Sequence, residues 1–204
     1  SSVAPGTEFK IPPEMAALTK SRSALAAENA MYRVQLSGSS KGVNLTPEQK
    51  LRLQSSIAEV DSRRRTAALE ADQLEKQLAQ TVVQLKTAQE IFKINQGIFN
   101  DLDVVAREGG LPRVQYLRQA QEVKNSQAKV QQLQEEQGRL RLAIAQAKQK
   151  LQNTIALSQQ DLLTKIAEND KKLAEIDTQL NKAIVENEKK IAEIDSQLKQ
   201  AEQT

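Results

Sequence analysis

The side chains that could do acid–base chemistry in this sequence are carboxylates and amines. The 204 residues include 26 aspartates and glutamates and 29 lysines and arginines, but no histidine and no cysteine. The carboxylates stand beside lysines at helix-surface spacing, where no pocket is expected to shift their pKa values towards general acid or base catalysis. Imidazole and thiolate nucleophiles, and the usual zinc ligands, are absent. We therefore expect no enzyme activity and no catalytic, metal-binding or cofactor-binding site.

Motifs for phosphate, nucleic-acid or membrane binding are also missing. Neither a GxxxxGK[ST] loop nor a GxGxxG loop occurs in the sequence. Basic residues are mixed with acidic ones: residues 113–204 contain 15 of the former and 13 of the latter. Nucleic acid requires a contiguous basic surface, so we expect no nucleic-acid partner. No apolar run approaches the about 20 residues that span a bilayer.

Residues 98–118 concentrate the residue types that contact other proteins. They contain two of the five aromatic residues, next to paired glycines that permit a chain reversal. Apolar and basic side chains near such a turn could dock between the helices of a partner. The residues predicted to bind a partner there are Asn100, Val104, Arg107, Gly109, Gly110, Leu111, Pro112, Arg113 and Tyr116. A purely structural interpretation stays open, in which they only close the turn over a small core.

Long helices must position this turn. The 5 prolines and 7 glycines cluster at a few places and leave three stretches of helix-forming composition, at about 14–36, 46–107 and 112–203. Thr46-Pro47-Glu48-Gln49 is typical of a capping box that begins the second helix. The turn between the second and third helices is predicted at 107–112.

Apolar residues recur in the two long stretches at spacings of seven and eleven. In 46–107 the predicted packing seam consists of Leu53, Ile57, Val60, Ala67, Leu74, Leu78, Leu85 and Phe92. In 112–203 it consists of Leu133, Leu140, Ile144, Leu151, Ile155, Leu162, Ile166, Leu173 and Ile184. Mixed spacings of this kind indicate a long seam with weak supercoiling. We predict an all-α fold, a long antiparallel coiled-coil hairpin whose ascending arm is interrupted near 37–45.

An internal repeat lies near the end of the third stretch. Residues 166–180 and 184–198 are identical at 11 of 15 positions. Their offset of 18 residues is five helical turns, so equivalent residues face the same way. Asn169 and Asn187 each follow a seam isoleucine by three residues. We interpret them as polar flanks of the seam or as core asparagines that fix its register.

Helix lengths favour a single hairpin domain. At about 1.5 Å per residue the third stretch would extend about 135 Å, nearly matched by the first two together. Both chain ends would then meet at the base, as in a domain inserted into another. Residues 1–10 have the composition of a linker or a cloning remnant, and 11–204 would form the α-helical hairpin domain of a larger protein.

The segment VAREGGLPRVQYLRQAQ, Val105 to Gln121, is followed by a helix rich in Gln, Ala and Leu that ends IAEIDSQLKQAE. This pattern resembles the α-helical hairpin domain of the haemolysin D (HlyD) family over nearly all of 14–204. These proteins are periplasmic adaptors, or membrane fusion proteins, of type I secretion and tripartite efflux systems. Many members carry Arg, Leu and Ser at their tips, where this sequence has Asn100, Val104, and Leu111 or Pro112.

The resemblance implies a protein of the periplasm, anchored to the inner membrane outside this sequence. It also implies a hexameric homo-oligomer whose hairpin tips contact an outer-membrane channel of the TolC type. Domains outside this sequence would contact an inner-membrane ABC transporter. The adaptor would link transporter and channel across the envelope gap.

Two other classes stay open. One is the coiled-coil arm of a cytoskeletal or chromosome-organising protein, whose helices would continue to a globular head. The other is the helical arm of an enzyme such as a synthetase, for which a basic, RNA-binding surface is expected. The near balance of charge over 113–204 argues against the second class.

Overall fold

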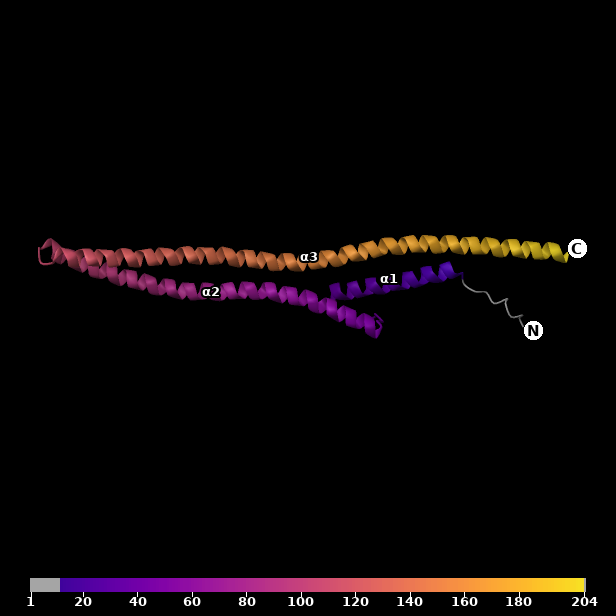
Figure 1. Cartoon of the computed structure of the whole chain (residues 1–204), viewed down its shortest axis with the longest axis horizontal. Coiled ribbons are helices and arrows are strands. Elements are labelled where there is room, and N and C mark those ends of the chain that lie inside the picture. Colours follow the sequence, from indigo (N-terminus) through magenta and orange to yellow (C-terminus); the bar gives the residue numbers. More distant parts are fainter. Residues whose placement is uncertain (1–11, 204) are drawn as a thin grey trace. The chain divides into compact units, whose positions relative to one another are not determined.

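The computed structural model describes residues 12–203, which form three α-helices and no strand (Figure 1). Helix α1 spans Pro13–Ser37, α2 spans Pro47–Arg107 and α3 spans Arg113–Glu202. The predicted all-α class is confirmed. Each helix end lies within one residue of the range expected from the sequence. The predicted linker over residues 1–10 lies outside the described residues.

Local signals explain where the helices begin and end. The backbone N–H of Gln49 donates to Thr46 Oγ1 at 3.2 Å, and the N–H of Thr46 donates to Gln49 Oε1 at 3.0 Å. This reciprocal pair is the predicted capping box. At the end of α1, Gly38 adopts a φ of 73° and its N–H donates to the Val34 carbonyl at 2.8 Å. A left-handed glycine is a common helix stop.

The chain divides into two compact units, and residues 12–60 with 156–203 form the first. Within it, early residues of α1 contact late residues of α3, so the two helices are antiparallel (Figure 1). The first turns of α2 pack against the last turns of α1. Their small core consists of Met31, Val34 and Leu53, with Val43 and Leu45 of the connecting segment packed against it.

Residues 61–155 form the second unit, which is an antiparallel hairpin of α2 and α3. Lys148 Nζ lies 3.0 Å from Glu75 Oε1, and nearer the turn Tyr116 hydrogen-bonds to Asp103. Leu85, Ala88 and Leu133 form a buried cluster between the helices. The predicted helical hairpin is confirmed.

Alanines contribute more to the seam than the leucine pattern predicts. The buried ones are Ala67, Ala71, Ala88 and Ala147. Three predicted seam residues are instead exposed: Ile57 at 43%, Ile155 at 38% and Ile184 at 42%. Ile57 and Ile155 each follow a seam leucine by four residues and are rotated about 40° from it around the helix, whereas Ile184 lies near the position where α1 begins. A contact between two helices covers only a narrow stripe, so Ile57 and Ile155 lie at its edge.

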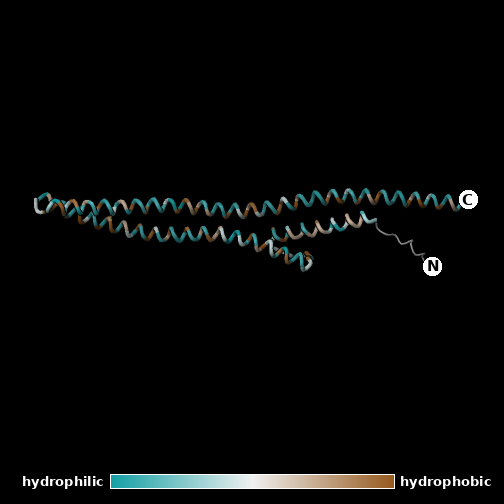
Figure 2. Tube along the Cα trace, in the orientation of Figure 1, coloured by the Kyte–Doolittle hydropathy of each residue, from teal (hydrophilic) through white to brown (hydrophobic). Residues whose placement is uncertain are grey.

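Apolar and polar residues are interspersed along every helix (Figure 2). In the described part of the chain, no helix combines the length and the apolar character that crossing a membrane requires.

Candidate functional site

The turn between α2 and α3 is closed by two glycines with different roles. The Gly109 N–H donates to the Ala106 carbonyl at 3.0 Å, and the Gly110 N–H donates to the Val105 carbonyl at 3.1 Å. These two bonds make a Schellman motif, in which Gly109 has a φ of 78°. Gly110 serves close approach, because a Cβ there would lie 3.3 Å from Val105 Cγ1.

Alanine substitutions should change the free energy of unfolding in opposite directions at this turn and at glycines inside the helices. Gly109→Ala should lower the free energy of unfolding by about 1 kcal/mol, because a side chain is strained at that φ. Gly97→Ala and Gly138→Ala should raise it by about 0.5–1 kcal/mol each, because both sites are helical and open around the added Cβ. Urea unfolding followed by circular dichroism measures all three. A stabilising Gly109→Ala would contradict the assigned role of this glycine.

The start of α3 completes the turn. The Pro112 carbonyl accepts the N–H groups of Gln115 at 3.1 Å and Tyr116 at 3.3 Å. Leu111, just before it, is half-buried. The chain therefore enters α3 directly after the Schellman motif, as the sequence pattern predicts.

Side-chain contacts across the turn define a hairpin tip, residues 95–119. Asp103 joins the two helices, because its Oδ1 accepts the Tyr116 hydroxyl at 3.2 Å while its Oδ2 lies 3.0 Å from an Arg107 guanidinium nitrogen. The rings of Phe99 and Tyr116 are tilted at 42° with centroids 5.2 Å apart. Gln119 Nε2 donates to the Asn95 carbonyl at 3.0 Å. These contacts join the two helices at the turn through hydrogen bonds, an ion pair and one aromatic contact.

Sequence reasoning missed Asp103, which the structure places at the centre of these contacts. Its spacing of four residues from Arg107 is a signal for an ion pair on one helix face and could have identified it. Asn95 and Gln119 carry no comparable signal, because their bond joins residues 24 positions apart.

All nine predicted site residues lie in the hairpin tip, but they differ in what they offer a partner. Tyr116 and Leu111 are half-buried and hold the turn, whereas the remaining seven are exposed. The exposed ones are Asn100, Val104, Arg107, Gly109, Gly110, Pro112 and Arg113. Val104 is 58% exposed. Arg107 is paired with Asp103, so Arg113 is the more available cation of the two.

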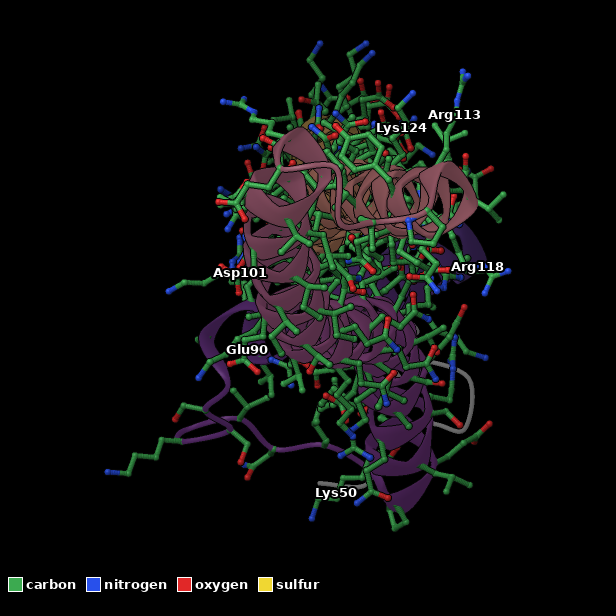
Figure 3. All side chains as sticks on the ribbon, turned by 90° about the vertical axis from the view of Figure 1, so that its left-hand side faces the viewer. Lys50, Glu90, Asp101, Arg113, Arg118 and Lys124 are labelled. Carbon is green, nitrogen blue, oxygen red and sulfur yellow. The ribbon has the colours of Figure 1, made fainter. Side chains whose placement is uncertain are left out.

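The two sides of the hairpin tip carry opposite charge. Figure 3 shows Asp101 and Glu90 on the α2 side and Arg113 and Arg118 on the opposite side. Within the hairpin tip, 95–108 contain three acidic residues and one basic residue, whereas 113–119 contain two basic residues and no acidic residue. The hairpin tip therefore has an electrostatic polarity that the charge of the whole chain conceals.

An exposed apolar stripe runs along one face of α2 towards the turn. Its members, 40–66% exposed, are Val83, Ile91, Ile94, Ile98 and Val105. Spacings of three, four, seven and eight residues place them on one helix face. Val83 and Ile91 of this α2 stripe line a shallow groove whose other side includes Ser126 and Leu133 of α3. The sequence patterns did not single out this face.

A second cluster, in the first unit, joins α1 to α3 through polar side chains. We call Glu28, Asn29, Tyr32, Asn169 and Asp170 the polar joint. Asn169, 5% exposed, donates to Glu28 Oε1 at 3.1 Å, and Asn29, 1% exposed, donates to Asp170 Oδ1 at 2.9 Å. Hydrogen bonds from two buried asparagines to specific carboxylates fit only one alignment of the two helices, which supports a register-fixing role for Asn169. Asn187 is half-buried, with Nδ2 4.0 Å from Met15 Sδ.

The polar joint shifts two ionisation equilibria. Hydrogen bonds from Asn169 and Tyr32 lower the pKa of Glu28, since both donate to its carboxylate. Desolvation and the bond to Glu28 raise the pKa of Tyr32 to about 12. At the hairpin tip, desolvation and the bond to Asp103 also raise the pKa of Tyr116. Among the described residues, no three metal-binding side chains come together.

The two tyrosines allow these shifts to be measured one at a time, because the chain has no tryptophan. In Tyr116→Phe, phenolate absorbance should report Tyr32 with a midpoint about 12. In Tyr32→Phe, the remaining Tyr116 should titrate above 10.0. The pKa of each tyrosine should return to about 10 in concentrated urea, where the chain is unfolded. Between pH about 10 and about 12, Tyr32 keeps its proton in the folded chain but loses it in the unfolded chain. The contribution of Tyr32 to stability therefore falls as the pH rises through this range. Unshifted titrations in the folded chain would show that neither hydroxyl is engaged.

With this geometry established, solved structures provide a close match in fold. No known family model and no curated protein matches the sequence. The crystal structure of the soluble domain of LipC, a membrane fusion protein of a type I secretion system, is similar with a TM-score of 0.73. The chain has the fold of a membrane fusion protein's soluble domain. The similarity covers 89% of this chain and 95% of that chain at 15% sequence identity. It confirms the fold that the HlyD resemblance implied.

Proposed function

We propose that this chain is the periplasmic adaptor arm of an export machine. It spans the envelope gap and docks through its hairpin tip onto an outer-membrane channel of the TolC type. It links that channel to an inner-membrane ABC transporter through domains of a larger, membrane-anchored protein. The observation that carries the proposal is the similarity in fold to the soluble domain of LipC, over most of both chains.

The hairpin tip supports a docking role because its contacts leave a rigid, varied surface. Asp103 and Tyr116 hold the two helices together at the turn, which pre-organises the exposed residues around them. Val104 supplies apolar contact, and the Arg113 guanidinium can bind carboxylates or the carbonyls at a helix C-terminus. A channel built of helices presents apolar side chains as well as such carboxylate and carbonyl acceptors.

We also propose homo-oligomerisation, as a hexamer in the full-length protein, and the polarity of the hairpin tip supports contact between neighbouring copies. The acidic α2 side and the basic α3 side are complementary in charge, and α3 also exposes Val114 and Leu117. Contact between unlike faces is heterologous, and heterologous contacts close into rings when the rotation permits.

Site-specific photo-crosslinking in cells tests the proposal. A photoreactive residue replaces Val104 in the full-length protein, produced together with its own transporter and channel. We expect an adduct with the outer-membrane channel. The matched control is Leu163, in the first unit, which is also 58% exposed and should give no channel adduct. A channel adduct at Leu163 alone, or adducts only with cytoskeletal or chromosomal proteins, would contradict the proposal.

A further inference from the structure

Arg107 lies on the same face of α2 as two other residues predicted to bind a partner. Asn100, Val104 and Arg107 are spaced by four and three residues, which brings their side chains to one side of the helix. All three are exposed, Val104 at 58% and the Arg107 side chain at 80%. A partner surface that covers Val104 therefore also meets the Arg107 guanidinium.

In the structure this guanidinium is paired within its own helix. Asp103 lies one turn before Arg107, and its Oδ2 is 3.0 Å from a guanidinium nitrogen. A guanidinium has five N–H donors, more than one carboxylate oxygen can accept. Donors of Arg107 therefore remain for a second acceptor.

The two oxygens of Asp103 have separate partners. Oδ1 accepts the Tyr116 hydroxyl of α3 at 3.2 Å, whereas Oδ2 pairs with Arg107. The bond to Tyr116 joins the two helices, but the pair with Arg107 stays within one turn of α2. The hairpin tip can therefore keep its bond between the helices when Arg107 leaves Asp103.

The ion pair between Asp103 and Arg107 is easily exchanged. Pairs of this kind on an exposed helix surface contribute little to stability, because water screens the charges and the long side chain loses freedom. A carboxylate of a docked partner attracts the guanidinium more strongly, since docking excludes water from between the charges. Arginine also binds a carboxylate through two parallel N–H bonds where the geometry allows it.

We propose that Arg107 exchanges Asp103 for a carboxylate of the docking partner, so that Asp103 competes for this arginine and limits the affinity of the hairpin tip. The inference rests on the proposed function and deepens it, because it states the chemistry of the partner. That partner presents an aspartate or glutamate next to an apolar surface that covers Val104. Tyr116 still donates to Asp103 after the exchange, so the released carboxylate keeps a donor.

A purely structural role for the ion pair predicts the opposite effect on docking. If the pair only stabilised the turn, its removal would weaken docking or leave it unchanged. If Asp103 competes with the partner, removal of its charge strengthens docking. Asp103→Asn separates the two cases. An asparagine keeps one oxygen for the Tyr116 hydroxyl and replaces the other by an NH₂ group, which cannot pair with a cation.

The measurement is the dissociation constant between the full-length protein and its own outer-membrane channel, both purified in detergent, by surface plasmon resonance. Asp103→Asn should lower this constant about two- to fivefold at low salt, and the gain should shrink at high salt. In Arg107→Gln, which lacks the guanidinium, adding Asp103→Asn should not lower the constant. Helicity and melting should match those of the unchanged protein.

The matched control is Asp61→Asn, which frees an arginine far from the hairpin tip. Asp61 Oδ2 is 2.9 Å from Arg65, four residues later, and the two side chains are 30% and 76% exposed. The values for Asp103 and Arg107 are 29% and 80%. The two aspartates are about 60 Å apart along α2. Asp61→Asn should leave the dissociation constant unchanged.

Arg113→Glu and Val104→Glu show whether binding depends on the hairpin tip at all. If they weaken binding but Asp103→Asn does not strengthen it, this inference is wrong and the proposed function stands. An equal gain from Asp61→Asn, or a gain that persists in Arg107→Gln, would overturn the inference in the same way. If both tip variants bind the channel like the unchanged protein, the proposed function and this inference fail together.

Discussion

Leu140→Ala is expected to lower the free energy of unfolding by about 2–5 kcal/mol. Leu140 is 1% exposed, the most buried apolar side chain among the described residues. Removing it takes away apolar burial and leaves a cavity that two long helices can only partly close. Urea unfolding followed by helical circular dichroism measures the loss.

The matched control lies two residues away on the same helix. Leu142 is 62% exposed, so Leu142→Ala should change stability by within about 0.5 kcal/mol. Both substitutions replace leucine by alanine in α3, so the change in helix propensity is shared and cancels in the comparison. Equal losses at the two positions would mean that packing between α2 and α3 does not stabilise this unit.

Helix ends were predictable from the sequence because the signals are local. Thr46 and Gln49 are three residues apart, and their reciprocal bonds need no distant partner. Gly109 acts through its own φ, which a side chain would strain. The beginning of α2 and its end at the turn follow from such local signals.

The packing of one helix on another was less predictable. Ala71 and Ala147 are buried although neither stands out in a leucine pattern, and Ile184 is exposed although it matches the spacing of eleven. Whether a side chain is covered depends on where the partner helix runs and where it ends. For Ile184 the decisive fact is the position at which α1 begins, which spacing within α3 does not contain.

In the candidate site, too, local features were predictable from the sequence and contacts between distant residues were not. The sequence located the turn and its exposed residues, because glycine, proline and arginine are concentrated there. It did not reveal that Asp103 holds Arg107, which changes how the two arginines should be tested. In the polar joint, Asn169 was noticed but its partner Glu28 was not, because 141 positions separate them.

Loss of export after changing the charge of the hairpin tip is the largest functional effect that we expect. The variant combines Arg113→Glu with Arg107→Gln. Asp103 lies one helical turn before Arg107, and its carboxylate is 3.0 Å from the Arg107 guanidinium. A glutamate at 107 is avoided because it would repel this carboxylate, which also accepts the Tyr116 hydroxyl. Reversing a charge that meets an acidic or carbonyl-rich partner should lower secretion at least about tenfold.

Folding should be unaffected, within about 0.5 kcal/mol, because both side chains are exposed. The measurement is the amount of the transporter's own cargo in the medium, with helicity and melting of the purified chain recorded in parallel. The control is Lys171→Gln with Lys189→Glu, which makes the same change in net charge at exposed positions of α3 in the first unit. Export should be normal in that control if the partner contacts the hairpin tip. Normal export from the tip variant together with loss in the control would place the contact along the side of the arm, and the assignment of the nine tip residues would be wrong.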